Sequence, residues 1–310
     1  MGVYVNTNVS SLNGRRYLNN VQNQLTTTYQ RLSSGLRINS AKDDAAGLQI
    51  SSRLTTQVNG LNQGNRNAAD GIALAQTIEG AMDETTSMLQ KIRTLAVQAA
   101  NGTNTGEDKA ALSKEATALV AEIDRIAGQT RFGGALILDG SDNTGLLVGG
   151  KKSAGQLTLQ VGANKGDTIS FDIANAHFTR IADATKKFGQ GGGGAGGKIE
   201  MDKFYNKTAK AIEFSKADAA QTAIAAMDAL IAQVDAERAG LGAIQNRLES
   251  SIRNQANVSA NQADARSRIR DADFAEESAN LSQQSIIQQA ATSMLMQANT
   301  RPQLGLSLLG

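Results

Sequence analysis

The sequence predicts a mainly α-helical protein, a long antiparallel coiled-coil bundle with a small β-hairpin region and a short outer insert. Apolar residues recur every three or four positions through several long stretches, which is the period of amphipathic helices. The 310 residues include one proline, so these stretches are not broken. Aromatic residues make up only 4% of the chain, which suits thin helical seams better than a thick globular core.

The first element is predicted to be a helical arm within residues 1–40. Its apolar residues step by three and four along one heptad seam, and its flanks carry mostly amides and hydroxyls. The seam consists of Leu18, Val21, Leu25, Thr28 and Leu32. Gly35 and the polar residues 37–44 then interrupt the helix.

Residues 41–173 are predicted to hold two helices followed by a hairpin. A heptad pattern from about residue 45 to 100 corresponds to a helix roughly 80 Å long at 1.5 Å per residue. That length exceeds a compact domain and favours a bundle or coiled coil. A glycine-rich turn at residues 101–106 leads to a shorter helix that ends near residue 127.

Alternating apolar and polar residues then predict β-structure. Residues 157–161 and 169–173 alternate, and Asn164, Lys165, Gly166 and Asp167 lie between them as a turn, which indicates a β-hairpin. Residues 132–140 suggest an irregular strand or turn.

Residues 174–214 show little periodicity. The run 189–197 is almost all glycine and is predicted to be a mobile surface loop. Because the segment is too short for a sizeable core of its own, we expect a short outer insert.

A second long helix is predicted within residues 215–262, with a clear heptad seam to about Gln255. Residues 261–273 are polar and charged and are expected to form a joint before the C-terminal arm, which we place at 263–310. The arm's apolar stripe includes Leu281, Ile287, Ala291, Met294 and Ala298.

The C-terminal arm has no charged residue between Glu277 and Arg301. A solvated helix face usually carries charge, so we expect this helix to be covered on more than one side. The simplest interpretation is that the two arms pair and then pack against other copies. Two alternatives stay open: a plain intramolecular core, and a membrane-surface helix, which the amide-rich polar faces disfavour.

Composition narrows the function classes. Lys and Arg number 31 against 29 Asp and Glu, spread along the chain, which argues against nucleic acid as the main partner. No apolar run approaches the roughly 18–20 residues of a membrane span, so no membrane insertion is expected. The absence of Cys rules out disulfides and thiol chemistry. The first residues lack the basic start and apolar core of a cleaved secretory signal.

No enzyme site is predicted, and we expect no catalytic residue, metal or cofactor. Segments 145–151 and 192–198 have the glycine spacing of a phosphate-binding loop, but Lys152 and Ile199 replace the Ser or Thr that must reach magnesium. His177 is the single histidine, which argues against a zinc site or a histidine-centred catalytic set.

Two acid pairs are better interpreted as helix caps or ion-pair partners than as metal ligands. They are Asp43 with Asp44, and Asp271 with Asp273. Neither has the spacing or the glycine of a calcium-binding loop.

Several long motifs resemble those of bacterial flagellins. Residues 30–48 (QRLSSGLRINSAKDDAAGL) resemble the N-terminal signature of that family. Its C-terminal signatures are matched by LGAIQNRLES at 241–250 and SRIRDADFAEE at 267–277. The hairpin run QVGAN at 160–164 and the ending LSLL at 306–309 are similar too. The resemblance covers roughly residues 1–170 and 215–310.

The resemblance implies a structural subunit of the helical flagellar filament used for swimming. It implies an inner core domain (D0-like) made of arms 1–40 and 263–310, and a long-helix domain (D1-like) made of 41–173 and 215–262. The short variable insert 174–214 would face outward. A hook-filament junction or adaptor protein that shares the same terminal helices is the alternative.

Partners and location follow from the same resemblance. It implies a homopolymer outside the cell, exported through the flagellar type III apparatus without a cleaved signal peptide. Flagellar cap and hook-associated proteins, and an export chaperone that holds the C-terminal arm, would be further partners. An arm alone buries too little surface to offset its ordering entropy, so it is expected to be largely disordered in the monomer.

The resemblance also implies a site that a host Toll-like receptor reads. The matching positions in this sequence are Leu89, Lys91, Leu95 and Glu115. Lys91 departs from the usual Arg, and a point charge replaces a planar fork there, so weaker recognition is expected. Packing between subunits is the alternative role for these positions.

Overall fold

The computed structural model describes residues 7–139, 155–173, 175–188, 201–207, 209–216 and 218–307, with side chains left out at 184–188, 202 and 301–307. The glycine run 189–197, both phosphate-loop near misses, residues 1–6 and the last three residues lie outside this part. The chain divides into two compact units, residues 1–59 with 258–310, and residues 60–257. Each unit is described by itself.

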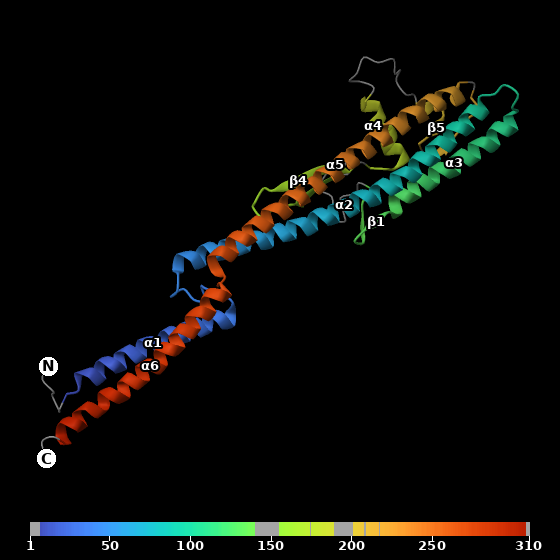
Figure 1. The fold of residues 1–310 in the computed structure, drawn as a ribbon. Coiled ribbons are helices and arrows are strands. Elements are labelled where there is room, and N and C mark those ends of the chain that lie inside the picture. The colour runs from blue at the N-terminus through green and yellow to red at the C-terminus, as the bar shows by residue number, and fades with distance from the viewer. Residues whose placement is uncertain are drawn as a thin grey trace. The chain divides into compact units, whose positions relative to one another are not determined.

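The unit formed by residues 1–59 and 258–310 pairs the two ends of the chain. Helices α1 (Val9–Ser34) and α6 (Phe274–Ser307) lie side by side and antiparallel (Figure 1). The Asn8 side chain caps α1 by accepting from Ser11 N at 3.1 Å. Gly35 ends α1 with φ 70°, a left-handed conformation that glycine adopts without strain. Both predicted arms are therefore helices.

Two long helices contribute to both units, α2 (Ala45–Ala99) and α5 (Ala219–Arg270). The first matches its predicted extent. The second runs on through 261–270, where part of a joint was expected, and the break between α5 and α6 falls at residues 271–273. Residues 261–270 contain no Gly or Pro, and a polar helix that faces water needs no apolar period to continue.

The unit formed by residues 60–257 has one large core. Helix α3 (Gly106–Gln129) starts with a capping box in which Thr105 and Asp108 satisfy each other's backbone N–H groups. The predicted β-hairpin is confirmed as β3 (Gly155–Gln160) and β4 (Thr168–Ile173), with Gln160 opposite Thr168. A smaller hairpin, β1 (Arg131–Phe132) with β2 (Ala135–Leu136), occupies the irregular segment.

The hairpin β3–β4 lies directly on α2 because helix glycines, Gly60, Gly64 and Gly71, leave room for it. A Cβ at Gly64 would stand 2.1 Å from Val161 O, and one at Gly71 would stand 2.3 Å from Leu159 Cδ1. Asn67 Nδ2 donates to Gln160 O at 2.9 Å and fixes the end of β3 along the helix.

The sequence did not predict that the described residues between 175 and 216 would pack into the main core of this unit. They form α4 (Phe178–Phe188), a 3-10 turn (Met201–Lys203), β5 (Tyr205–Asn206) and β6 (Ala211–Ile212). Their large apolar side chains join the core shared with α2, α3 and α5. The fully buried ones include Phe178, Phe204 and Phe214. The segment needs no core of its own because it completes an existing one.

Candidate self-assembly surface

The paired arms are held by hydrogen bonds that uncharged side chains of α1 and Asn8 donate to α6. Asn8 Nδ2 donates to Ala298 O at 2.8 Å, and Ser11 Oγ donates to Asn299 Oδ1 at 2.7 Å. Further along, Thr28 Oγ1 donates to Gln284 Oε1 at 3.3 Å. Residue numbers fall along α6 as they rise along α1, which fixes an antiparallel register.

One ion pair anchors the other end of the paired arms. Arg31 Nη1 lies 3.1 Å from Glu277 Oε1, and Glu277 is only 7% exposed. Arg31 Nε is also buried and makes no hydrogen bond within the described part of the chain. Removing either partner would leave a poorly solvated charge, so this pair specifies how the arms meet.

The predicted seam residues are only partly used between the two arms. Val21, Leu25 and Ala291 are buried. Most of the others are half-buried: Leu18, Leu32, Leu281, Ile287 and Ala298. Met294 stands 69% exposed. The seam is therefore thin, and the intramolecular-core alternative accounts for only part of it.

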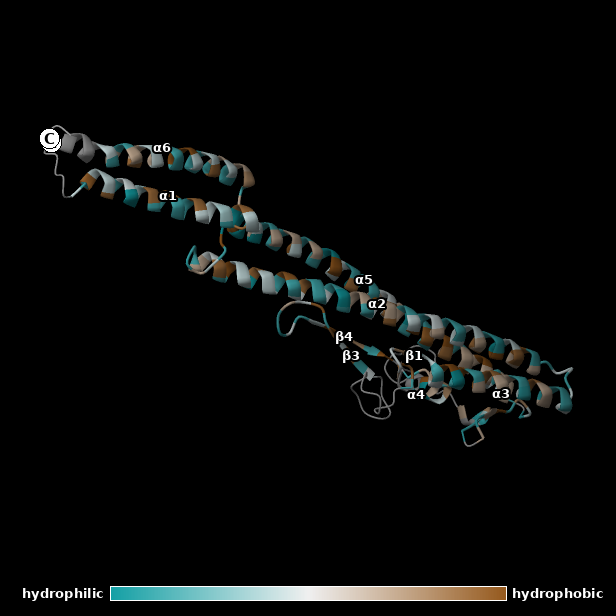
Figure 2. Ribbon diagram, turned by 90° about the horizontal axis from the view of Figure 1, so that it is seen from below, coloured by the Kyte–Doolittle hydropathy of each residue, from teal (hydrophilic) through white to brown (hydrophobic). Residues whose placement is uncertain are grey.

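Large apolar side chains remain exposed on both arms. On α1 these are Val9, Leu12, Tyr17 and Tyr29. On α6 they are Phe274, Ile286, Met294 and Met296. Figure 2 shows hydrophobic residues dispersed among hydrophilic ones along both helices. Sequence reasoning missed the four on α1, because they lie off the heptad seam that it followed.

A groove of about 1150 Å³ runs between the N-terminal half of α1 and the C-terminal half of α6. Tyr17, Ile287 and Met294 contribute its apolar wall, and Asn13 and Gln297 its polar rim. Gly14 lets α6 approach, since a Cβ there would stand 3.1 Å from Leu295 Cδ1. Uncharged walls of this kind suit another helix better than an ionic ligand.

The two breaks that separate the arms from the long helices are hydrogen-bonded to each other. Leu36 and Asp271 form an isolated β-bridge. Arg37 N donates to Arg270 O at 2.7 Å, and Ala272 N donates to Gly35 O at 3.0 Å. Both arms therefore start from one joint.

One acid of each pair near this joint caps a helix, and Asp43 instead orders the loop before α2. Asp43 accepts from the backbone N–H groups of Ser40 and Asn39, and these bonds lower the pKa of its carboxyl. Asp44 accepts from Gly47 N at 2.8 Å. Asp273 accepts from Ala275 N at 2.8 Å and begins α6. Within the described ranges no group of three or more His, Asp or Glu could hold a metal.

The four positions at which the resemblance implies receptor recognition do not all lie on the surface. Leu89 is fully buried in the core, Leu95 is half-buried, and Lys91 and Glu115 are exposed. Leu89 therefore serves packing within the subunit.

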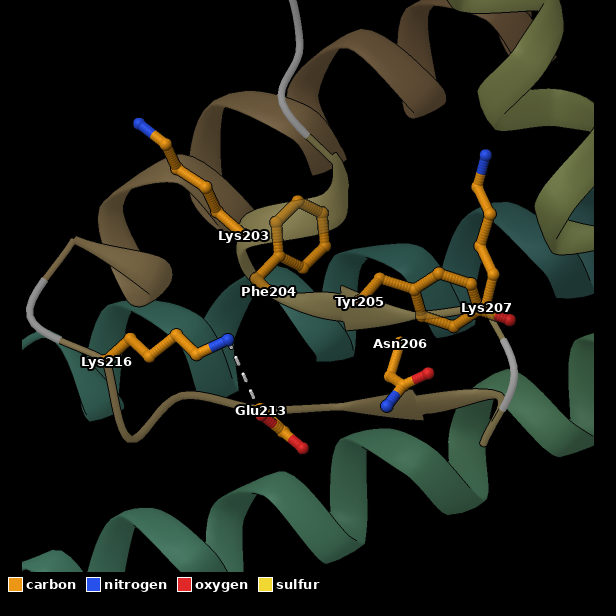
Figure 3. A pocket seen from close by; sticks show the side chains of 7 residues that line it. All are labelled: Lys203, Phe204, Tyr205, Asn206, Lys207, Glu213 and Lys216. Atoms are coloured by element: carbon orange, nitrogen blue, oxygen red, sulfur yellow. Dashed lines mark ion pairs between the residues drawn. The ribbon is translucent and has the colours of Figure 1, made fainter.

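A small hollow of about 230 Å³ lies beside β5 (Figure 3). Its rim carries Lys203, Lys207 and Lys216, and the figure shows the Lys216 ammonium directed toward Glu213. That pair lies at 3.9 Å, and Lys207 lies 3.8 Å from Asp183. These contacts describe a solvated charged rim and do not point to a ligand.

None of the helices, in the part of the chain that the structure describes, has an apolar stretch long enough to cross a bilayer.

Both terminal regions of the chain match models of known protein families. Residues 5–143 match the family model for the bacterial flagellin N-terminal helical region, and residues 224–309 match that for the C-terminal helical region. Flagellin B of Vibrio cholerae is 36% identical over 376 aligned positions that cover 100% of both chains. Flagellin D of Vibrio anguillarum is 38% identical over 379 positions, again covering 100% of both.

A solved structure shares the fold. A chain assigned as a flagellar hook-associated protein of Vibrio parahaemolyticus superposes with a TM-score of 0.55 at 17% identity, covering 74% of this chain and 100% of that one. At this identity the likeness concerns the fold alone.

Proposed function

The chain belongs to the bacterial flagellin family, and from this membership we propose that the exposed faces of α1 and α6 are the contacts through which it polymerises. The protein is a structural subunit of the flagellar filament, a helical polymer used for motility, and its relatives form that filament outside the cell. The family is one of structural proteins rather than enzymes.

The observation that carries the surface assignment is the thin seam between the arms. Eight large apolar side chains on these two helices are exposed in the single chain. Each is between 50% and 69% exposed, so covering it with a neighbouring subunit would contribute about 1–2 kcal/mol, roughly half to two thirds of the value for full burial. Each subunit contacts the next through two different surface patches. Such a contact repeats head-to-tail and builds an open helical polymer instead of a closed ring.

The domain boundaries are part of this proposal. Residues 1–40 and 263–310 act as the D0-like inner core, and 41–173 with 215–262 act as the D1-like long-helix domain. Residues 174–214 are the variable segment between them. Its buried aromatic residues support a role in closing the D1-like core, in addition to any outward role.

Further partners belong to the same proposal. An export chaperone would hold α6, whose uncharged, partly apolar surface needs cover before assembly. Flagellar cap and hook-associated proteins would meet the ends of the polymer. Export through the type III apparatus without a cleaved signal peptide follows from family membership. Lys91 and Glu115 are the accessible positions for a host Toll-like receptor, with Leu95 partly accessible.

Electron microscopy of the purified chain under salting-out conditions tests the proposal. The full chain should form long uniform filaments, and a truncation lacking about 40 residues at each end should stay monomeric. A full chain that remains monomeric even when seeded with filament fragments would overturn the proposal. The hook-filament adaptor would then be favoured, and it predicts a few copies at the filament base when the protein is labelled in cells.

A further inference from the structure

The chain's single histidine, His177, lies between two carboxylates in the unit formed by residues 60–257. Its Nδ1 is 3.2 Å from Asp124 Oδ1 on α3, and its Nε2 is 2.8 Å from Asp139 Oδ1, which follows β2. Phe178 N, the first residue of α4, donates to the same Asp124 oxygen at 3.1 Å. Lys210 Nζ, from the turn between β5 and β6, lies 3.1 Å from Asp124 Oδ2.

The geometry requires a charged ring. A neutral imidazole carries one N–H and can donate to only one of the two carboxylates, so its other nitrogen would set a lone pair against a carboxylate oxygen. The imidazolium has two N–H groups and satisfies both contacts. With His177 and Lys210 protonated and the two Asp residues ionised, the cluster is electrically balanced, and deprotonation of the ring leaves an excess negative charge.

The cluster fastens one particular element. Asn175 Nδ2 donates to Asp139 O at 2.6 Å, and Asn175 Oδ1 accepts from His177 N at 3.0 Å. The start of α4 is thus attached to α3 and to the end of β2 through His177 and its neighbours. By contrast, β6 and the residues after it are attached to α3 through Thr117 Oγ1 and Ser113 Oγ, which accept from Ile212 N and Phe214 N at 3.0 Å each.

We infer that His177 is a proton-operated latch that holds the start of α4 against α3 and releases residues 175–183 as the medium becomes alkaline. Two observations support this inference: the two ring nitrogens contact carboxylates on opposite sides, and His177 directly precedes α4. Residues 175–183 lie outside both family-model matches, whereas Asp124 and Asp139 lie within the N-terminal one.

The titration has a definite sign. The hydrogen bond to Asp124 raises the pKa of His177 above 6.5, burial lowers it, and the bond to Asp139 raises it again. When folding raises the pKa of a His, the resulting stability is fully present at pH values below the pKa of the unfolded chain. It is lost as the pH rises through the pKa of the folded chain. Among the described residues, Asp124 and Asp139 are the charged groups in contact with the ring, and Lys210 pairs with the second oxygen of Asp124. Burial raises the pKa of Tyr205 nearby, so that phenol stays neutral in this window.

The single histidine allows a direct test by NMR. In the monomeric full chain labelled with 15N-histidine, every ring signal comes from His177. We expect both nitrogens protonated at pH 6 and a pKa above 6.5. A pKa at or below 6.5, or one neutral tautomer at pH 6, would overturn the latch.

The pKa of His177 in three variants distinguishes the proposed latch from a histidine that serves packing alone. Asp139→Asn keeps an acceptor oxygen but removes a charge, so the His177 pKa should fall. Lys210→Met removes a competing cation and should raise it. Lys216→Met is the matched control, because both lysine side chains are 65% exposed and Lys216 pairs outside the cluster, and it should leave the pKa unchanged. Shifts of the same sign in the first two variants would contradict the assigned contacts.

Hydrogen exchange then measures the release. Protection of amides 178–183, corrected for intrinsic exchange, should fall between pH 6 and pH 9 by tenfold for each unit by which the folded pKa exceeds that of the open form. Amides 212–214 should show no such fall. In His177→Gln the protection of 178–183 should not change with pH over this range. Equal pH dependence in the variant and the natural chain would refute the latch.

Discussion

At the residue scale, single glycines set how closely the β3–β4 hairpin approaches α2. A methyl group at Gly64 would stand 2.1 Å from the backbone oxygen of Val161, and no side-chain movement relieves a clash with backbone. We therefore expect Gly64→Ala to lower the free energy of unfolding by about 1–3 kcal/mol, as overpacking does. Urea denaturation followed by circular dichroism measures the change.

Gly80→Ala is the matched control, since it lies in the same helix and a Cβ there meets nothing within 4 Å. It should raise stability by about 0.5–1 kcal/mol through helix propensity alone. If both variants are stabilised equally, the hairpin does not depend on close contact at Gly64.

Asp124 makes an acid-side prediction at the same scale. Burial would raise the pKa of its carboxyl, but hydrogen bonds from His177, Lys210 and Phe178 N outweigh burial and hold the pKa at about 2. The stability that the lowered pKa gives to the folded chain is fully present above pH 3.8, the ordinary pKa of an Asp carboxyl, and is lost as the pH falls through the folded pKa of about 2. Asp124→Asn should therefore cost about 2 kcal/mol at pH 5, and the difference from the natural chain should shrink toward pH 2.

Denaturation curves at pH 5, 3 and 2 provide that measurement. Asp228→Asn serves as the comparison, because its pairing with Arg93 is on the surface, where the two side chains are 54% and 43% exposed. Its effect should stay below about 1 kcal/mol. A pH-independent loss in Asp124→Asn would mean that its role is steric.

At the element scale, the helices and the main hairpin could be predicted because their signals are local. The heptad period, the turn glycines and the strand alternation can each be recognised from residues that are neighbours in the sequence. The assignment failed where contacts are long-range. Phe178, Phe204 and Phe214 stand in short elements without a period, and only the core shared with α2, α3 and α5 explains their burial. The contacts of His177 could not be predicted for the same reason, because its partners Asp124 and Asp139 lie 53 and 38 positions away.

The exposed face of α6 yields a prediction about assembly. Met296 is 66% exposed, so Met296→Gln should leave subunit stability within about 0.5 kcal/mol. In the filament the lost burial should raise the critical concentration roughly tenfold, since about 1.4 kcal/mol is one decade. Sedimentation of polymer at a series of subunit concentrations measures it. Met296→Leu keeps the apolar surface and should assemble normally, whereas equal critical concentrations for Gln and Leu would remove Met296 from the interface.

At the scale of the whole molecule, the two units differ in how much apolar surface they bury. The large core belongs to residues 60–257, and the arms share a few buried residues along one seam. Family motifs in the sequence predicted that the arms are assembly elements. They did not reveal which side chains remain uncovered, because exposure depends on the register between α1 and α6.

This contrast predicts how the free chain and the filament respond to chymotrypsin. Tyr17 and Phe274 are 56% and 68% exposed, whereas Phe178, Phe204 and Phe214 are at most 1% exposed. Cleavage of the monomer should therefore begin in the arms, because a thin seam opens locally far more often than a large core. Filaments at the same protease ratio should lose these cuts, since neighbouring subunits cover the arms. Mass spectrometry of the early fragments tests both expectations, and equal cleavage at Tyr17 in monomer and filament would show that assembly leaves α1 uncovered.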